Sequence, residues 1–295
     1  MNEADFIAAL RALPLDPGAR GLADDAATLD VGGETLILTH DTMCEGVHFL
    51  PSQDMADVAW KLVTSNLSDL AAMGARPLGV LLSHTLGEGD ERFLVGMAEV
   101  LARYEIGLLG GDTVSGRGER TLGLTAVGLA THKPAPARSG AQVGDALYVT
   151  GTLGAAMLGF EVLKGEREGD LAPYTRPEAR VAEGMALAPH VTAMMDVSDG
   201  LLLDAFRMAE ASETSIAIDT AACPVADPDR RMECLTWGDD YELLFTLPAD
   251  TEPPVPATRI GAVEPRGFAS LFVDREPIVS REGLGYQHQQ SSPSP

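Results

Sequence analysis

The sequence has 295 residues, more than the roughly 100–200 of a single domain, so we expect two domains with a cleft between them. Its 21 basic and 44 acidic side chains give a formal charge of −23, and no patch of basic residues is evident, which argues against a nucleic-acid-binding protein. The acidic N-terminus and the lack of an apolar run of ~18 residues argue against a signal peptide and a membrane partner, so we expect a cytoplasmic protein.

The first part of the chain alternates helical and strand-like patterns. A loop rich in Gly, Pro and Asp follows the first helical pattern, at residues 13–27. Gly74 and Pro77 end the longest predicted helix. The predicted elements are helices at 3–13, 54–74 and 90–105 and strands at 34–43, 77–86, 106–116 and 121–130.

A Pro-rich segment at residues 133–145 marks a domain boundary, and the strand-then-helix pattern begins again at residues 146–165. An Asp-rich turn within residues 194–212 leads into another helix. This order predicts an α/β or α+β fold. The predicted divisions are a first domain at 1–136, a second domain at 137–288 and a disordered polar tail at 289–295.

Aspartates stand at strand ends and glycine turns, where backbone geometry can hold several carboxylates together. Any one of them alone is more often a solvated loop residue or a helix cap. Gathered at a cleft they would repel one another unless cations bridged them, and carboxylate oxygens are ligands that Mg²⁺ prefers. Magnesium would also let an acidic protein bind phosphates. The six candidates are Asp25, Asp41, Asp69, Asp112, Asp196 and Asp199.

Other kinds of site are not indicated. Cys44, Cys223 and Cys234 are widely spaced and form no CxxC motif, which argues against a zinc site or a disulfide framework. The GxxxxGK[ST] phosphate-binding motif and the protein-kinase motifs are missing. The turn at residues 110–113 remains, where backbone N–H groups can approach phosphates while Asp112 holds a metal.

Eight segments occur in the order found in the thiamine-monophosphate kinase family, and together they cover nearly the whole chain. NLSDLAAMGA, and SDGL followed by DYELLF, are the most specific. The sequence therefore resembles that family, which belongs to the aminoimidazole-ribonucleotide-synthetase-like superfamily. The segments are GLADDAA, ILTHDTMCEGVHF, NLSDLAAMGARP, GGDT, RSGAQVGD, DVSDGL, DDYELLF and GYQH.

The resemblance implies two α/β domains, with the N-terminal sheets of two subunits closing into a barrel, and therefore a homodimer. In this arrangement residues 1–136 bind metal and ATP and form the dimer, and residues 137–288 complete the ATP and substrate cleft. It implies Mg²⁺-dependent in-line transfer of the γ-phosphoryl group of ATP to thiamine monophosphate, giving thiamine diphosphate and ADP. The acceptor is a phosphate monoester with a second pKa of about 6, so it needs no strong general base. Metal bridging and positioning then supply most of the rate enhancement.

The resemblance also implies roles for individual residues. The ring of Tyr286 would stack on a flat heteroaromatic substrate. The implied metal ligands are Asp25, Thr39, His40, Asp41, Asp69, Asp112, Asp196 and Asp199. The implied ATP contacts are Tyr104, Gly111, Asp112, Arg138 and Ser198. The implied substrate contacts are His48, Asp239 and Tyr286, and the implied catalytic residues are Asp69, Asp112 and Arg138.

Three positions depart from the family pattern. Asp239 stands where Glu is usual, so its carboxylate is one methylene shorter. His40 replaces the usual Thr, which removes a hydroxyl ligand and leaves only a backbone carbonyl. Ala23 replaces a Gly in the first loop, and alanine tolerates a positive φ less well.

Without the resemblance, residue type alone leaves plainer alternatives. His48 would be a packed histidine, Tyr104 a core residue, Arg138 a surface charge and Tyr286 a packing residue.

Two other functions are alternatives to the kinase. One is another ATP-using enzyme of the superfamily: aminoimidazole ribonucleotide synthetase, selenophosphate synthetase or the hydrogenase maturation factor. The last two use a terminal Cys or selenocysteine, whereas the first Cys here is Cys44 and the last is Cys234. The other alternative is a non-catalytic thiamine-phosphate-binding protein, which would bind its ligand without forming ADP.

Overall fold

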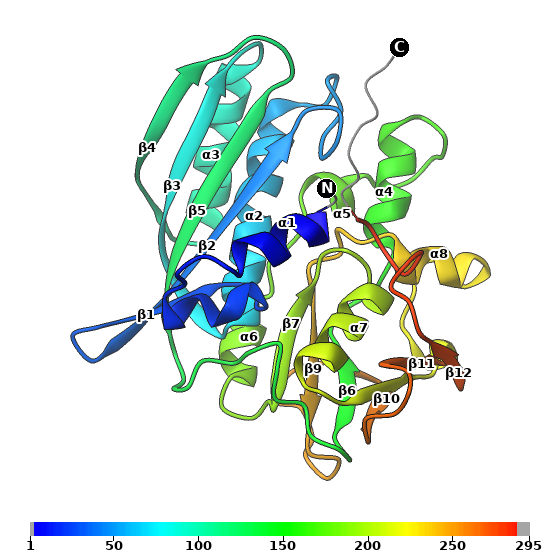
Figure 1. Cartoon of the computed structure of the whole chain (residues 1–295). Coiled ribbons are helices and arrows are strands. Elements are labelled where there is room, and N and C mark those ends of the chain that lie inside the picture. The colour runs from blue at the N-terminus through cyan, green and yellow to red at the C-terminus, as the bar shows by residue number, and fades with distance from the viewer. Residues whose placement is uncertain (1–2, 288–295) are drawn as a thin grey trace.

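The computed structural model describes residues 3–287 and contains two α/β domains, each built on a mixed sheet (Figure 1). The first sheet has the strand order β1-β2-β5-β3-β4, in which β3 and β4 run parallel. The second has the order β12-β11-β8-β10-β6-β9-β7, in which β8 and β11 run parallel. The predicted two-domain α/β fold is confirmed. The domain limits near residue 136 stay a prediction, and the predicted tail at 289–295 lies outside the described residues.

The elements of the N-terminal domain follow the predicted order, and the ends of the predicted ones differ by three residues at most. The strand β1 was not predicted, because it is short and follows the loop directly. The elements are α1 (Glu3–Leu10), a 3-10 helix (Pro17–Leu22), β1 (Ala27–Val31), β2 (Glu34–Cys44), α2 (Met55–Ala72), β3 (Ala75–Leu86), α3 (Asp90–Arg103), β4 (Gly107–Ser115) and β5 (Thr121–Ala130).

The helix α2 lies between the two domains. Asp54 caps its first turn by accepting a hydrogen bond from the Ala56 N–H at 3.0 Å, and Gly74, at a φ of 60°, follows its end. The helix packs against β2 and β5 on one side and against α6 (Val181–Leu187) and β7 (Ala193–Val197) on another. Fourteen of its 18 residues are buried for this reason, including several polar ones.

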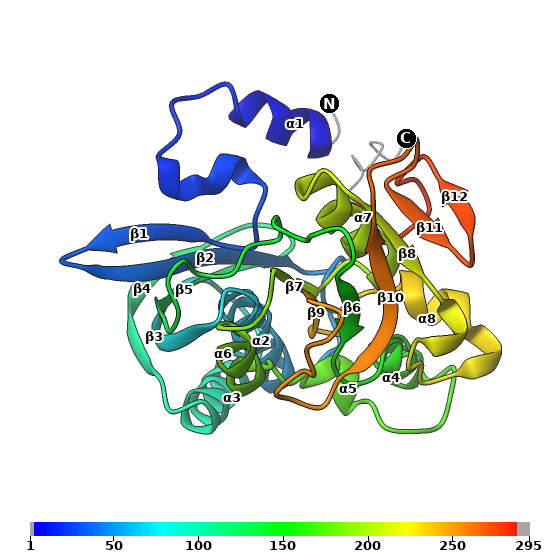
Figure 2. The same ribbon diagram turned by 90° about the horizontal axis from the view of Figure 1, so that it is seen from below.

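The N-terminal sheet is covered unequally on its two faces. The helices α2 and α3 lie against one face, where Ile37 and Met43 of β2 are buried (Figures 1 and 2). On the other face His40 and Thr42 are exposed, and Leu81 of β3 is 39% exposed. All nine residues of the edge strand β4 are exposed. This face and edge are therefore open in the single chain.

Three neighbouring strands at one end of the C-terminal sheet are buried on both faces, unlike β4. Every residue of β6, β7 and β9 is buried, and their sequences are correspondingly apolar. The remaining elements are β6 (Ala146–Val149), α4 (Ala155–Leu163), α5 (Ala172–Thr175), α7 (Leu201–Ala211), β8 (Ser215–Ile218), two 3-10 helices (Thr220–Ala222 and Pro228–Arg230), α8 (Arg231–Thr236), β9 (Glu242–Leu247), β10 (Thr258–Glu264), β11 (Leu271–Val273) and β12 (Glu276–Ile278).

Within residues 3–287, no helix has both the length and the apolar character that crossing a bilayer requires.

Candidate functional site

Four carboxylates meet where β2, α2 and β7 face one another. Asp25 precedes β1, Asp69 lies on α2 and Asp196 on β7, and each places one oxygen within 4.8 Å of the others. Asp41 of β2 is close enough that its charge raises the pKa of both Asp69 and Asp196. We call Asp25, Asp41, Asp69 and Asp196 the carboxylate cluster.

Polar side chains hold these carboxylates in place. The Thr39 hydroxyl donates to Asp69, and the Ser68 hydroxyl donates to Asp196 at 2.6 Å. The Asn66 side-chain oxygen accepts from the Asp41 backbone N–H at 3.1 Å. Asn66, Ser68 and Asp69 all belong to the NLSD stretch of α2. That stretch therefore joins strands of both domains at the cluster.

The cluster carries more negative charge than its surroundings neutralise. Burial raises the pKa of Asp69 well above its usual value, and the charges of Asp41, Asp196 and Asp25 raise it further. Burial, followed by the charge of Asp25, does the same for Asp196. Burial also raises the pKa of Asp25, although Arg138 opposes that rise. A bound cation would relieve this repulsion.

The residues of the cluster fit a hard divalent cation such as Mg²⁺. Their donor atoms are all oxygens, and they include no His or Cys. The Asp25 Oδ2 atom is buried and has no hydrogen-bond partner among the residues that the structure describes. An acceptor left in that state is costly unless a ligand fills it.

Arg138 lies beside the cluster and is not the surface charge that residue type alone would suggest. Its guanidinium pairs with Asp25, and its side chain is only 18% exposed. Its backbone N–H donates to Asp24 Oδ1 at 2.9 Å, and Asp24 also pairs with Arg20 at 2.6 Å. The Arg138 Nε is buried without a partner in the described part of the chain, which leaves a donor for an anion such as phosphate.

The turn after β7 brings Ser198 and Asp199 next to the cluster. Asp199 pairs with Arg207 at 2.5 Å, and its charge contributes to the raised pKa of Asp41. The Asp204 carboxylate accepts from the backbone N–H groups of Ser198 at 3.2 Å and Asp199 at 3.1 Å. Burial raises the pKa of Asp204 to about 7. Asp204 was not predicted from the sequence, although it lies only three positions after the end of the DVSDGL motif.

Two residues implied as phosphate or metal ligands, Gly111 and Asp112, lie apart from the cluster within one chain. The strand register aligns Thr42, Gly123, Ser83 and Asp112 across the sheet. Three strand spacings of ~4.8 Å place Asp112 about 14 Å from β2. Asp112 also belongs to the open face, opposite to the face of Thr39 and Asp41.

Two of the departures from the family pattern have a local explanation. The His40 ring lies on the open face, with its Nδ1 atom 2.8 Å from the Thr125 hydroxyl, so only its backbone carbonyl remains near the cluster. Ala23 has a φ of −127°, and the positive φ values fall at Arg20, Gly21 and Leu22 instead. Alanine at position 23 is therefore unstrained.

The implied substrate residues His48 and Asp239 are linked through a lysine that was not predicted from the sequence. Lys61 of α2 pairs with Asp239 at 2.7 Å and lies 3.8 Å from the centre of the Tyr174 ring. The Tyr174 hydroxyl donates to the His48 carbonyl at 3.1 Å. Lys61 stands among the apolar residues of a helix, and this unusual position could have identified it as a functional residue from the sequence.

Asp239 and Tyr286 both form backbone hydrogen bonds with the turn after β7. The Asp239 N–H donates to the Ser198 carbonyl at 2.8 Å, and the Tyr286 N–H donates to the Asp199 carbonyl at 2.9 Å. A Cβ on Gly238, whose φ is 97°, would lie 2.4 Å from the Ser198 oxygen, so the position requires glycine. Three separate motifs therefore meet at one turn, and the Tyr286 side chain there is 43% exposed.

Tyr104 takes part in the packing of the single chain, and its implied contact with ATP stays a prediction. Its half-buried hydroxyl accepts from the Ala179 backbone N–H at 2.8 Å. This contact fixes the segment that leads into α6.

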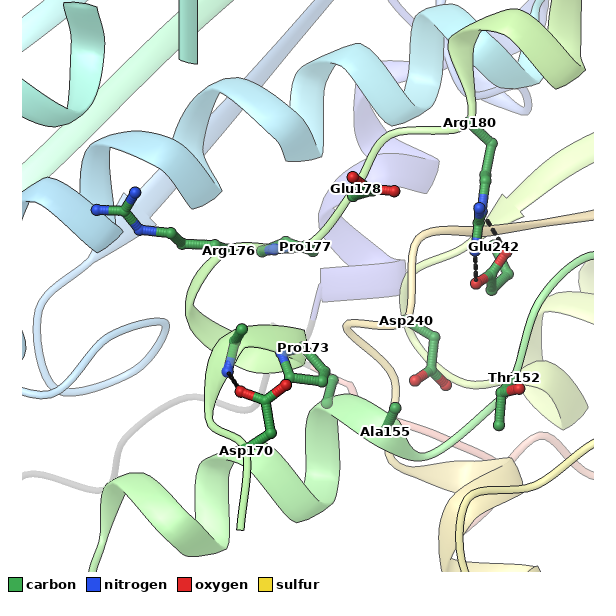
Figure 3. A pocket seen from close by; sticks show the side chains of 12 residues that line it. Thr152, Ala155, Asp170, Pro173, Arg176, Pro177, Glu178, Arg180, Asp240 and Glu242 are labelled. Atoms are coloured by element: carbon green, nitrogen blue, oxygen red, sulfur yellow. Dashed lines mark hydrogen bonds and ion pairs between the residues drawn. The ribbon is translucent and has the colours of Figure 1, made fainter. Parts of the chain in front are cut away.

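A separate hollow of about 340 Å³ lies between residues 170–180 and the start of β9 (Figure 3). Arg180 there pairs with Glu242 at 2.6 Å, and Arg176 pairs with Asp57 at 2.5 Å. The Asp240 carboxylate accepts from the Gly154 N–H at 2.9 Å. The charged side chains of Arg176, Arg180 and Asp240 in this hollow thus already have partners within the protein. None of the four cluster carboxylates lines it.

The arrangement of this chain is found in known proteins. Residues 23–130 match the N-terminal domain of AIR synthase related proteins, and residues 142–274 match their C-terminal domain. The thiamine-monophosphate kinase of Escherichia coli K12 is 36% identical, over 91% of this chain and 91% of that protein.

Two solved structures are similar over almost their whole length. AaThiL complexed with AMPPCP and TMP has a TM-score of 0.85 at 30% identity, covering 98% of this chain and 97% of that one. Thiamine-monophosphate kinase from Stenotrophomonas maltophilia K279a has a TM-score of 0.75 at 35% identity, covering 93% and 96%. With the fold, the motifs and these identities in agreement, the chain belongs to the thiamine-monophosphate kinase family.

Proposed function

We propose that this chain transfers the γ-phosphoryl group of ATP directly to thiamine monophosphate, giving thiamine diphosphate and ADP. The observation that carries the proposal is the buried, uncompensated carboxylate cluster in a chain of this family. The similar AaThiL structure was solved with AMPPCP, an ATP analogue, and with TMP.

The cluster residues Asp25, Asp69 and Asp196 would hold Mg²⁺, with Asp41, Asp199 and the backbone carbonyls of Thr39 and His40 as further candidate ligands. Magnesium would supply the positive charge that lets two phosphate groups approach each other. Thr39 and Ser68 keep the carboxylates oriented toward the centre of the cluster. Asp69 is the residue that we expect to matter most, because three other carboxylates act on it.

Arg138 and the turn after β7 would bind the nucleotide phosphates. The Arg138 Nε offers a buried donor, and Ser198 lies in the same turn as Asp199. The acceptor oxygen is already largely ionised at neutral pH, so these residues need only align the two substrates. His48, Asp239 and Tyr286 would bind the organic part of thiamine monophosphate.

We also propose a homodimer in which the N-terminal sheets of two subunits close into a barrel. The support is the open sheet face and the exposed edge strand β4, since paired or covered edges are the rule in natural sheets. Asp112 belongs to this open face, so its carboxylate would reach a site only across the dimer interface.

Mixing two inactive variants tests the dimer and the placement of Asp112 together. Subunits carrying Asp69→Asn and subunits carrying Asp112→Asn would form mixed dimers with one intact site. Random assortment predicts recovery of about a quarter of wild-type activity. No recovery, or a monomeric mass in solution, would refute the shared site.

The decisive assay measures ADP and thiamine diphosphate formed from ATP and thiamine monophosphate, with magnesium and after chelation. Equal, magnesium-dependent formation of both products is the expected result. ADP without thiamine diphosphate would favour another enzyme of the superfamily. Ligand binding without ADP would favour a non-catalytic binding protein.

A further inference from the structure

Lys61 is an unusual residue for the middle of a buried helix. Its side chain is 1% exposed, and burying an ammonium group is costly unless a partner of opposite charge compensates it. Here Asp239 Oδ2 accepts from the Lys61 Nζ at 2.7 Å, and the Tyr174 ring covers the same nitrogen at 3.8 Å. The position of this ammonium group is therefore fixed.

Asp239 is held on both carboxylate oxygens. Lys61 binds Oδ2, and the Tyr241 hydroxyl donates to Oδ1 at 2.9 Å. The backbone of Asp239 has a φ of 57° and donates to the Ser198 carbonyl, which prevents the short side chain from changing its direction. The side chain is still 33% exposed, so the held carboxylate keeps a free edge toward solvent.

Lys61 is also linked, through Tyr174, to His48, another of the implied substrate residues. The Tyr174 ring that contacts its ammonium group carries the hydroxyl that donates to the His48 carbonyl. A single side chain of α2 thus contacts Asp239 directly and His48 through Tyr174.

We propose that Lys61 is a positioning residue of the substrate site, which fixes the Asp239 carboxylate to accept a hydrogen bond from an N–H group of a heteroaromatic amine substrate. This inference rests on the proposed function, in which Asp239 contacts thiamine monophosphate. An aspartate is one methylene shorter than the glutamate usual in the family, so its reach depends on where Lys61 holds it.

The test compares Lys61→Met, Asp239→Asn and the double variant by equilibrium binding of thiamine monophosphate and by steady-state kinetics. Loss of a charge-assisted hydrogen bond predicts a rise of about tenfold in Kd and KM for thiamine monophosphate in Lys61→Met. The KM for ATP should change by less than about twofold, since the nucleotide does not use this pair. The double variant should bind no worse than the weaker single variant, because the two residues act as one unit.

Arg120→Met is the matched control. Arg120 is 8% exposed and pairs with Asp90 at 2.6 Å, within the N-terminal domain. Its loss should lower the melting temperature without changing the Kd or KM for thiamine monophosphate. Lys61→Gln keeps a hydrogen-bond donor without the charge, so we expect it to fall between wild type and Lys61→Met. It replaces Lys61→Met if that variant does not fold.

The possible failures are distinguishable. A wild-type protein that neither binds nor phosphorylates thiamine monophosphate refutes the proposed function, and the role of Lys61 with it. If Asp239→Asn weakens binding but Lys61→Met and Lys61→Gln bind as tightly as wild type, only the role of Lys61 is refuted. Additive effects in the double variant refute it as well.

Discussion

The carboxylate cluster and the group around Arg120 both hold buried charge, yet only the second is balanced within the protein. Arg120 pairs with Asp90 at 2.6 Å and donates to the carbonyls of Glu88 at 2.7 Å and Thr85 at 3.2 Å. His84 Nε2 lies 3.0 Å from the same Asp90 oxygen. We call Arg120, Asp90 and His84 the Arg120 cluster. It joins β3, α3 and the start of β5.

The carboxylate cluster has no such compensation. Arg138 pairs with Asp25, but the charges of the neighbouring carboxylates raise the pKa of Asp69 and Asp196. Balanced charges of the first kind stabilise a fold, whereas unbalanced ones reduce stability and are kept for ligand binding. This difference separates the buried charges that stabilise the fold from those that the protein keeps for binding a ligand.

The largest expected effect comes from Asp69→Asn. In the proposed magnesium site, removing the negative charge of Asp69 should lower kcat by about 10³-fold. The same change should raise the free energy of unfolding of the metal-free protein by on the order of 1 kcal/mol, since it relieves repulsion. Kinetics and chemical denaturation measure the two effects. Asp250→Asn, in an exposed loop, is the control and should change neither.

Arg120→Met should have the opposite pattern. It leaves Asp90 and the carbonyls it bound without their partner, which should cost about 3–5 kcal/mol of unfolding free energy. The kcat at temperatures below the transition should not change. The double variant with Asp90→Asn should recover part of the loss in a denaturation experiment, and a loss of activity without a loss of stability would contradict the balanced role.

Magnesium should stabilise the protein through the carboxylate cluster alone. At a concentration of 100 times its Kd, a ligand that binds only the folded state adds about 2.7 kcal/mol of unfolding free energy. Melting curves in chelator and in magnesium should show this gain for wild type and for Arg120→Met. A similar gain in Asp69→Asn would place the ion elsewhere.

The smallest expected effect is a pH dependence of the Arg120 cluster. Desolvation raises the pKa of Asp90, but hydrogen bonds from His84, Gly87 and Arg120 lower it more, so the pKa lies below the usual 3.8. A depressed pKa contributes stability above the unfolded value and loses it as pH falls through the folded value. The stability difference between wild type and Asp90→Asn should therefore shrink as the pH falls below about 4. A difference that grows below pH 4 would show that the pair does not stabilise the ionised Asp90.

Local patterns in the sequence were enough for most elements of the N-terminal domain and for part of the site. The NLSD stretch lies on a predicted helix, and the DVSDGL turn follows a predicted strand, so both could be recognised from nearby residues alone. These features predicted a two-domain α/β protein with carboxylates gathered at a cleft. Asp25, Asp69 and Asp196 do lie close together in the structure.

The partners of the buried charges were decided only by the tertiary structure. Lys61 and Asp239 are 178 positions apart, and no spacing in the sequence pairs them. The direction of Asp112 depends on a register shift between Val80 and Leu81, where Leu109 is the extra residue of β4. Because side chains alternate along a strand, that one residue turns Asp112 to the open face. The sequence alone determined which residue types are present and their local periodicity, whereas long-range register and charge pairing depend on contacts that form only when the chain is folded.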